Sequence, residues 1–322
     1  MLPGLGIISE LLPVFARKPL FGYRWVALSS LGIALVGFLV WGHHMFTVGM
    51  PVTGQLFFMY ATMLIAVPTG VKVFNWVSTM WQGSLSFETP MLWAIAFVIL
   101  FTIGGFSGLM LAIVPADFQY HDTYFVVAHF HYVLFGTIVF ATYSGIYFWF
   151  PKMTGRMYNE RLGRIHFWLT FVAFNVTFAP MHIIGVQGMP RRVYDYAEEF
   201  ATWNMIVSVA SFVLGLSTLI FLYNVITSWR SGPRGSHSLP AVYLSSPFPF
   251  GFFIRYKKVS SPEQEVIVFP HPQRSFFPGD EGKRRRDGGE TYREEKGFEG
   301  EIFSVRDYQA GDPLRFIHWK AS

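Results

Sequence analysis

Long apolar segments constrain this chain more than any other feature of its sequence. Six stretches are mainly apolar and reach the roughly 20 residues that a helix needs to cross a bilayer. They lie at about 24–42, 54–80, 90–113, 124–150, 164–187 and 201–229. We therefore expect an all-α polytopic membrane protein with about six transmembrane helices, followed by a small β-containing C-terminal tail.

The charged residues divide the chain near residue 230. Residues 1–230 contain only 11 of the 25 Lys and Arg and 8 of the 20 Asp and Glu, although they form most of the length. This distribution predicts a membrane domain at 1–230 and a soluble domain at 247–322. Ser, Gly and Pro predict a linker at 231–246. Within the tail, residues 265–269 have the composition of a strand.

Cysteine is absent from the sequence. This excludes disulfides, thiolate zinc sites, iron–sulfur clusters and covalent haem attachment through Cys. Any metal must therefore be bound by His, Asp, Glu or Tyr. Residues 1–22 do not read as a cleavable signal peptide, because Pro3 and Pro13 interrupt them and a basic start is missing.

Basic loops predict the orientation of the spans. One basic cluster lies at 17–24, before the first span, and a second lies at 152–164, after the fourth. Since four spans separate them, both clusters are expected on the cytoplasmic side, as is the tail after the sixth span. The opposite, outer face then receives three polar pairs: His43 with His44, His121 with Asp122, and Arg191 with Arg192.

His129 and His131 are two residues apart on a predicted helix. At 100° per residue their side chains point about 200° apart, so they cannot chelate one metal. Each could instead bind a different metal centre, one on either side of the helix. The alternative is a pair of histidines whose hydrogen bonds are satisfied inside a helix bundle, although ionisable residues inside spans are usually functional.

His43 and His44 follow each other at the end of the first span. Adjacent imidazoles are ~100° apart on a helix and can both reach one metal if the helix end is irregular. Imidazole suits copper and iron; the alternative is an interfacial polar pair. His121 and Asp122 could bind a hard cation such as magnesium through Asp122, or could form a helix cap.

Lys72 lies inside the second predicted span, with Thr69 about one turn away. A lysine there is costly unless water or a partner reaches it, so a proton path is the functional interpretation. Snorkelling of the side chain to the interface is the alternative. Arg191 and Arg192 could bind carboxylates, such as haem propionates, through bidentate hydrogen bonds; contact with lipid headgroups is the alternative.

Five motifs in residues 1–230 resemble those of one family. The region is similar to the C-terminal half of subunit I of the haem–copper oxidases, of the cytochrome c oxidase type. The motifs occur in the order and spacing of that family: LPGLGIIS at 2–9, WGHHMFTVGM at 41–50, IAVPTGVKVFNW at 65–76, HDTYFVVAHFHY at 121–132 and GMPRRVYDY at 188–196.

The resemblance implies a role for each candidate residue. His43 and His44 match two of three copper ligands, His129 matches the axial ligand of the high-spin haem, and His131 matches one of two axial ligands of the low-spin haem. The remaining matches concern magnesium, the haem propionates and the proton-conducting lysine channel. They are His121 and Asp122 for magnesium with Asp117 beside it, Arg191 and Arg192 for the propionates, and Lys72 with Thr69 for the channel.

The resemblance also implies an activity and its partners. The cofactors would be two haems, copper and magnesium, and the reaction would be reduction of O2 to water by cytochrome c with proton pumping. Because Cys is absent, the copper that first accepts electrons would lie on another oxidase subunit. We expect a multi-pass protein of the bacterial inner membrane that contacts lipid and no nucleic acid. A quinol-driven oxidase is the alternative, although the motifs at 121–124 and 189–192 resemble the cytochrome c branch more closely.

Several features of that family are not found in this sequence. The third copper histidine, in a His-Pro-Glu-Val-Tyr motif, is not found, and neither are the second low-spin haem ligand and the aspartate-led proton channel. We therefore expect this polypeptide alone not to reduce oxygen. The alternative is a non-catalytic membrane fragment, or a fusion artefact, with a soluble interaction tail.

The tail resembles a different family. PFPFGFF at 247–253, VIVFP at 266–270 and EIFSVRDYQAGDPLRFIHWK at 301–320 are similar to a bacterial family of unknown function linked to von Willebrand factor A-like domains. That resemblance implies no biochemical role. Local packing is the expected role of His318 and Trp319.

Overall fold

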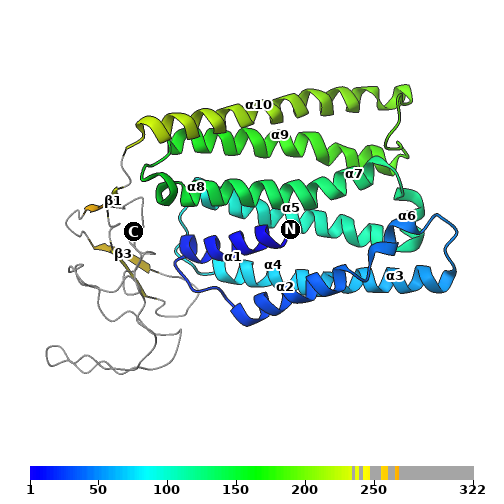
Figure 1. Ribbon diagram of the computed structural model, residues 1–322, viewed down its shortest axis with the longest axis horizontal. Coiled ribbons are helices and arrows are strands. Elements are labelled where there is room, and N and C mark those ends of the chain that lie inside the picture. Colours follow the sequence, from blue (N-terminus) through cyan, green and yellow to red (C-terminus); the bar gives the residue numbers. More distant parts are fainter. Residues whose placement is uncertain (234–235, 239–241, 247–254, 260–264, 268–322) are drawn as a thin grey trace.

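A bundle of helices forms most of the computed structural model, which describes residues 1–233, 236–238, 242–246, 255–259 and 265–267. The long helices run side by side along one axis, with α10 at one edge and α2 and α3 at the other (Figure 1). The elements of the bundle are α1 (Leu2–Ala16), α2 (Tyr23–Gly37), the 3₁₀ helix η1 (Trp41–Met45), α3 (Val52–Leu64), α4 (Ala66–Met80), α5 (Thr89–Ala112), α6 (Val114–Tyr120), α7 (Tyr124–Phe130), the π-helix η2 (His131–Val139), α8 (Phe140–Thr154), α9 (Glu160–Val186), the 3₁₀ helix η3 (Glu198–Phe200) and α10 (Ala201–Ser231).

The expected all-α polytopic membrane fold is confirmed. Among the described residues, five helical segments are long and apolar enough to cross a membrane: Val52–Met80, Thr89–Ala112, Tyr124–Thr154, Glu160–Val186 and Glu198–Ser231. The segment expected to be the first span forms α2, which has 15 residues. At 1.5 Å per residue α2 is about 22 Å long, shorter than the roughly 30 Å hydrocarbon core.

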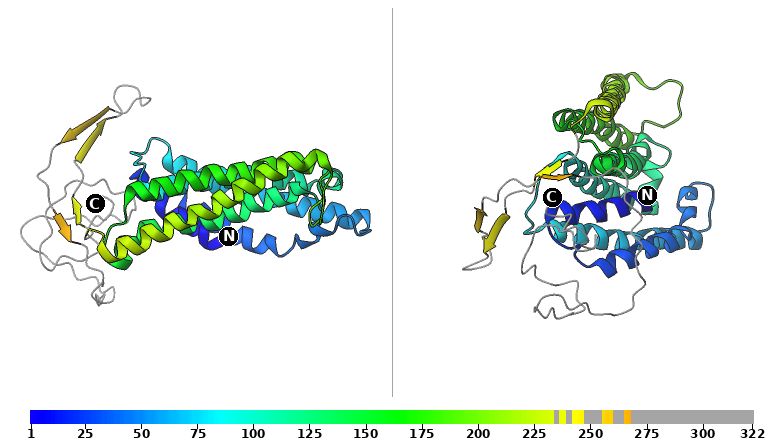
Figure 2. Two further views of the ribbon diagram at one scale, coloured as in Figure 1. Left: turned by 90° about the horizontal axis from the view of Figure 1, so that it is seen from above. Right: turned by 60° about the vertical axis from the view of Figure 1, so that its left-hand side comes forward.

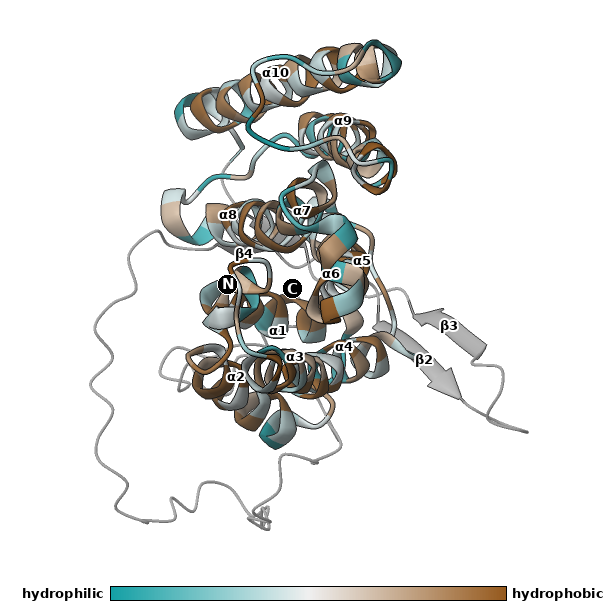
Figure 3. Ribbon diagram, turned by 90° about the vertical axis from the view of Figure 1, so that its right-hand side faces the viewer, coloured by the Kyte–Doolittle hydropathy of each residue, from teal (hydrophilic) through white to brown (hydrophobic). Residues whose placement is uncertain are grey.

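Apolar side chains cover the outside of the bundle as well as its centre. Figure 3 shows hydrophobic colour on the outward faces of the helices and hydrophilic colour in connecting loops. Phe212 and Leu216 on α10 are 74% and 59% exposed. A surface of this kind is stable in contact with lipid rather than water.

The predicted span at 54–80 is divided into α3 and α4 at Ile65. Pro68 follows one turn later, and because it has no N–H, the carbonyl of Leu64 loses its helical partner. By contrast, α1 continues through Pro13, which the sequence suggested would interrupt it. Membrane helices tolerate such prolines when neighbouring groups satisfy the backbone.

Aromatic rings connect α5, α8 and α9 at the centre of the bundle. The ring centroid of Phe140 lies 4.9 Å from that of Trp93 and 5.7 Å from that of Phe174, in edge-to-face arrangements. All three side chains are fully buried. Each such pair contributes about 0.5–1.5 kcal/mol beyond its buried area, so this cluster holds the three helices at fixed positions.

The helix that carries both histidines of the 121–132 motif is not a uniform α-helix. Thr123 begins α7 by accepting a hydrogen bond from the backbone N–H of Phe125 at 3.2 Å. The π-helix η2 starts at His131 and extends to Val139, after which α8 resumes the α-helical pattern. Gly155, at φ 70°, ends α8 in the left-handed conformation that favours glycine.

α10 packs along α9 over much of its length. Seen from above, the two helices cross at a shallow angle (Figure 2). Thr170 on α9 donates to Ser217 on α10 at 2.8 Å, and Asn224 on α10 accepts from the backbone N–H of Asn159 at 3.0 Å. These buried polar contacts fix the register between two largely apolar helices.

Four short strands follow the bundle. β1 (Ser236–Ser238) pairs antiparallel with β4 (Glu265–Ile267), and β2 (Val242–Ser246) pairs antiparallel with β3 (Arg255–Val259). The segment that composition predicted to be a linker therefore contains β1 and β2. The strand predicted at 265–269 is confirmed for Glu265–Ile267, while residues 247–253 and 301–320, which carry the second resemblance, lie outside the described residues.

Candidate functional site

His43 and His44 converge at the end of the α2 segment. Both lie on η1, where the chain leaves the α-helical pattern. Their Nε2 atoms are 3.0 Å apart and their ring centroids 4.2 Å apart. The irregular helix end thus brings both rings to one point, as expected for a pair that binds one metal.

Thr62 on α3 determines which nitrogen of His43 carries the proton. The Thr62 hydroxyl donates to the carbonyl of Phe58 at 2.6 Å, so its oxygen can accept from Nδ1–H of His43, 3.1 Å away. Nε2 of His43 therefore keeps its lone pair. Burial lowers the pKa of His43 to about 4, helped by His44 and His129, so the ring is neutral at pH 7, the form that binds metals.

His129 on α7 faces α5. Its Nδ1 lies 3.0 Å from the carbonyl oxygen of Gly104 and 3.0 Å from the hydroxyl of Ser107. The Ser107 hydroxyl itself donates to Gly104 O at 2.9 Å, so both groups accept from Nδ1–H and leave Nε2 free. Gly108 gives the ring its space, because a Cβ there would lie 2.8 Å from Cε1 of His129.

His131 faces α9, on the other side of the same helix. Its Nδ1 donates to the carbonyl of Val127 at 2.8 Å. The ring stacks on Phe178 of α9, with centroids 4.0 Å apart and planes 15° from parallel. The two histidines therefore point to opposite sides of the helix, as the two-residue spacing predicted, and the carbonyl contact again leaves Nε2 free.

The second polar pair is tied to the loop before α10. Asp122 accepts from Arg191 Nε at 2.8 Å, and its carbonyl accepts from the backbone N–H of Arg191 at 2.9 Å. Asp122 adopts a left-handed φ of 51°. Thr123 caps α7, while His121 is the C-cap residue of α6, with its backbone N–H donating to the carbonyl of Asp117. The anionic partner of Arg191 is thus a protein carboxylate.

His121 connects Asp117 and Asp122. Its Nδ1 is 3.1 Å from Asp117 Oδ2 and its Nε2 is 3.7 Å from Asp122 Oδ2. Burial raises the pKa of Asp117, while the neighbouring His121 opposes that increase. The His121 imidazole thus lies between two carboxylates, and these three side chains are not arranged closely enough to hold one metal ion. Arg192 is exposed at a φ of 63° and makes no ion pair with any other residue in the described part of the chain.

Lys72 is fully buried on α4 rather than directed to the interface. Its Nζ donates to Ser30 Oγ at 2.6 Å and to the carbonyl of Val26 at 3.1 Å, both on α2. It also lies 5.9 Å from the Trp76 ring centroid. Thr69 donates to carbonyls of its own helix turn and therefore does not hydrogen-bond Lys72 through that proton.

Sequence reasoning missed the residues that orient the histidines. Thr62, Ser107 and Gly108 are 19 to 22 residues away from the rings that they contact. A weak signal existed at 104–108, where two glycines four residues apart lie on one face of α5. No local signal identified Thr62 or Ser30.

The donor set fits the metals and haems that the histidines suggested. Three imidazoles have Nδ1 engaged by a carbonyl or hydroxyl, an arrangement that metal-binding histidines commonly show. Neutral imidazole suits copper and iron. Among residues 1–233 and the described strands, no three His, Cys, Asp or Glu residues come close enough to hold one metal ion, and His43 and His44 form a group of two.

The fold and the histidine geometry define a polytopic membrane protein with imidazole sites on both sides of one helix. A sequence model of the family Cytochrome C and Quinol oxidase polypeptide I matches residues 1–213. The chain belongs to that family. A solved structure of a haem–copper terminal oxidase dimer has the same fold, with a TM-score of 0.65 and 18% identity over 72% of this chain and 46% of that chain.

Curated relatives agree with this assignment. Cytochrome c oxidase subunit 1 of Corynebacterium diphtheriae is 56% identical over 72% of this chain and 41% of its own length. The protein of the same name from Synechocystis sp. is 53% identical over 74% and 43%, and that from Cereibacter sphaeroides is 50% identical over 73% and 41%. The chain thus spans about two fifths of the length of these relatives.

Proposed function

We propose that this chain supplies part of the catalytic subunit of a terminal respiratory oxidase, which transfers electrons from cytochrome c to O2 and pumps protons. The observation that carries the proposal is the placement of His129 and His131 on opposite sides of one helix. His43 and His44 converge at one point, with their Nε2 atoms 3.0 Å apart.

The residues of the chain have separate tasks in this proposal. Nε2 of His129 would bind the high-spin haem, and the Nδ1 contacts to α5 would hold the ring in place. Nε2 of His131 would bind the low-spin haem from the α9 side. His43 and His44 would bind copper, with a third ligand from the family's His-Pro-Glu-Val-Tyr motif. When bound, haem iron and copper supply the electron-transfer and oxygen-reducing chemistry of the family.

Lys72 and the outer polar residues have supporting roles. Lys72 would carry protons, because its Nζ is hydrogen-bonded to a hydroxyl on α2 and can exchange a proton through it; Thr69 would line the same path. Arg191 and Arg192 would bind haem propionates. His121 and Asp122 would bind magnesium, with Asp117 beside them.

The proposal includes a location and partners. The protein would lie in the bacterial inner membrane with its tail in the cytoplasm, in complex with other oxidase subunits, one of which carries the first electron-accepting copper. Cytochrome c would be the electron donor. The relatives named above are cytochrome c oxidase subunits, which favours this donor over quinol.

Spectroscopy of the full chain tests the proposal. The chain would be produced in an oxidase-deficient bacterium, with and without the segment of the Corynebacterium diphtheriae relative that it does not match. We expect a reduced-minus-oxidised haem spectrum and a carbon monoxide-sensitive haem in the complemented sample. His129→Ala should remove the carbon monoxide signal and His131→Ala the low-spin signal. His166 is a buried histidine of α9 that is not a proposed ligand, so His166→Gln should retain both signals.

Featureless spectra in the complemented sample, with the chain present in the membrane, would contradict the proposal and favour a non-catalytic membrane protein. If the complemented sample shows the expected haem signals, oxygen uptake with reduced cytochrome c or with a quinol separates the two electron donors. Faster uptake with quinol would replace the cytochrome c assignment.

A further inference from the structure

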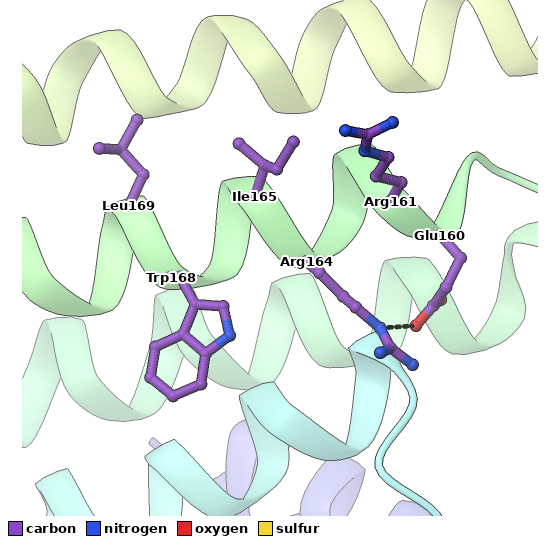
Figure 4. A pocket seen from close by; sticks show the side chains of 6 residues that line it. All are labelled: Glu160, Arg161, Arg164, Ile165, Trp168 and Leu169. Atoms are coloured by element: carbon purple, nitrogen blue, oxygen red, sulfur yellow. Dashed lines mark hydrogen bonds and ion pairs between the residues drawn. The ribbon is translucent and has the colours of Figure 1, made fainter.

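A groove on α9 begins at its N-terminal end and continues along its contact with α10. The first part is lined only by residues of α9, among them Arg161, Arg164 and Trp168 (Figure 4). The second part lies between Val172 and Val176 of α9 and apolar residues of α10 that include Val209. Leu169 lines both parts, so the two parts adjoin at this residue.

The first part of the groove has one net positive charge. Two arginines and Glu160 line it. Glu160 is already engaged, since its Oε1 accepts from Arg164 Nε and from the backbone N–H of Thr89, both at 2.9 Å. Arg161 is exposed and makes no hydrogen bond or ion pair with any other residue in the described part of the chain. Figure 4 shows its side chain on the α10 side of α9, with Arg164 on the opposite side.

The second part of the groove is apolar throughout. Val172 and Val176 are 54% and 40% exposed, and Val209 on α10 is 56% exposed. Trp168, at 54% exposed, lies between the charged and apolar parts, in the position that tryptophan favours at membrane interfaces. A ligand that fits this groove therefore has an anionic end and a long apolar end.

The dimensions of the groove match one leaflet of a bilayer. Residues 161 to 176 span about 22 Å along α9 at 1.5 Å per residue. Half of the hydrocarbon core is about 15 Å thick and a headgroup layer adds about 5–7 Å. The charged end therefore lies at headgroup depth when the apolar end reaches the middle of the bilayer.

The groove is separate from the histidine sites. The opposite face of α9 carries Phe174 and Phe178, which pack against Tyr132, Phe135 and His131 of η2. Residues 165, 168, 172 and 176 recur every three or four positions and so share the other face. Neither the haem ligands nor the copper ligands proposed above line the groove.

We infer that this groove binds one anionic phospholipid, with its phosphate at Arg161 and an acyl chain between α9 and α10. The single negative charge of a phosphatidylglycerol phosphate complements the net charge of the first part. Attraction to anionic lipid comes from each basic residue near the headgroups. The inference is independent of the proposed oxidase function, because it uses none of the metal or haem ligands.

Lipid retention by the full chain tests the inference. The chain is placed in nanodiscs that contain equal amounts of phosphatidylglycerol and phosphatidylcholine, extracted in mild detergent, and examined by native mass spectrometry for retained lipid. We expect one phosphatidylglycerol to be retained in preference to phosphatidylcholine. Arg161→Gln should retain about fivefold less phosphatidylglycerol. The double variant K152Q/R230Q removes two exposed charges from neighbouring helix ends and should retain it as the parent chain does.

A second variant tests the apolar part without changing charge. Val172→Trp fills the groove and should also reduce phosphatidylglycerol retention, whereas Leu219→Trp, on an exposed part of α10 outside the groove, should not. Equal retention of both lipids by the parent chain would overturn the inference, as would an Arg161→Gln variant that behaves like K152Q/R230Q. Loss of a co-purified polypeptide in Val172→Trp, with lipid retention unchanged, would overturn it in favour of a partner helix.

Discussion

The hydroxyl oxygen of Thr62 lies 3.1 Å from Nδ1 of His43 and has its own proton directed at the carbonyl of Phe58. This contact joins α3 to η1 and presents Nε2 of His43 beside Nε2 of His44. Residues that orient a metal-binding histidine change metal affinity about 10–100-fold when they are replaced. Thr62 is therefore a positioning residue for the candidate copper site.

Thr62→Val should weaken copper binding by about 10–100-fold, because Nδ1–H loses its acceptor and the ring loses its fixed orientation. Copper(I) titration of the full chain in detergent measures the affinity. Thr142→Val is the matched control, since Thr142 is an exposed residue of α8 that bonds only its own helix. Equal affinity in the two variants would show that Thr62 does not position His43.

Gly108→Ala should displace the His129 ring, because the added methyl group would lie 2.8 Å from Cε1. Overpacking of this kind costs about 1–3 kcal/mol of stability. We also expect the carbon monoxide-sensitive haem signal of the complemented protein to fall, with the low-spin signal of the His131 side retained. Gly105→Ala on the same helix has no atom within 4 Å of the new methyl group and should preserve both signals. An unchanged carbon monoxide signal in Gly108→Ala would place the haem elsewhere.

Ser30→Ala should destabilise the bundle by about 1–3 kcal/mol, because the buried Nζ of Lys72 loses its 2.6 Å acceptor. In a Lys72→Met background the same substitution should cost less, since no buried amine remains to be satisfied. Thermal unfolding of the four proteins in detergent gives the coupling. Additive effects would mean that Ser30 and Lys72 do not interact. Ser211→Ala, at an exposed hydroxyl of α10, should change little.

Gly185→Ala should separate α7 from α9, because a methyl group at this position collides with the backbone N–H of Phe125. We expect a loss of at least about 1–3 kcal/mol of stability, measured as a lower unfolding temperature. Gly215→Ala on α10 has no neighbour within 4 Å of the new methyl group. That control should raise stability by up to about 1 kcal/mol through helix propensity. Similar unfolding temperatures for the two variants would contradict the close approach of α7 to α9.

The sequence predicted those features that depend on local periodicity. Apolar length located the helices, because a bilayer requires about 20 residues per span. The opposite orientations of His129 and His131 followed from 100° per residue alone. The pairing of His43 with His44 required only an irregular helix end, which η1 provides.

The contacts between helices could not be predicted in the same way. The acceptor of Lys72 is Ser30, 42 residues away on α2, and the partners of His129 are on α5. Such contacts depend on how helices rotate and pack, which residue spacing within one helix does not determine. The division of the second span at Ile65 was accessible in principle, since Pro68 marks it. The π-helix η2 had no recognisable signal in the residues that form it.

The π-helix η2 determines how the residues that follow it are oriented. A π-turn holds more residues than an α-turn, so η2 acts as an insertion within an otherwise regular helix. It sets the rotational phase of α8 relative to α7, and therefore which residues of α8 face the aromatic cluster. If residues 131–139 adopted α-helical winding with no residue removed, every later side chain of the helix would rotate, because an α-helix advances 100° per residue and a π-helix advances less. His129 and His131 would keep their positions, whereas Phe140 would turn away from Trp93. The π-helix η2 therefore fixes the orientation of the aromatic cluster rather than that of the two histidines.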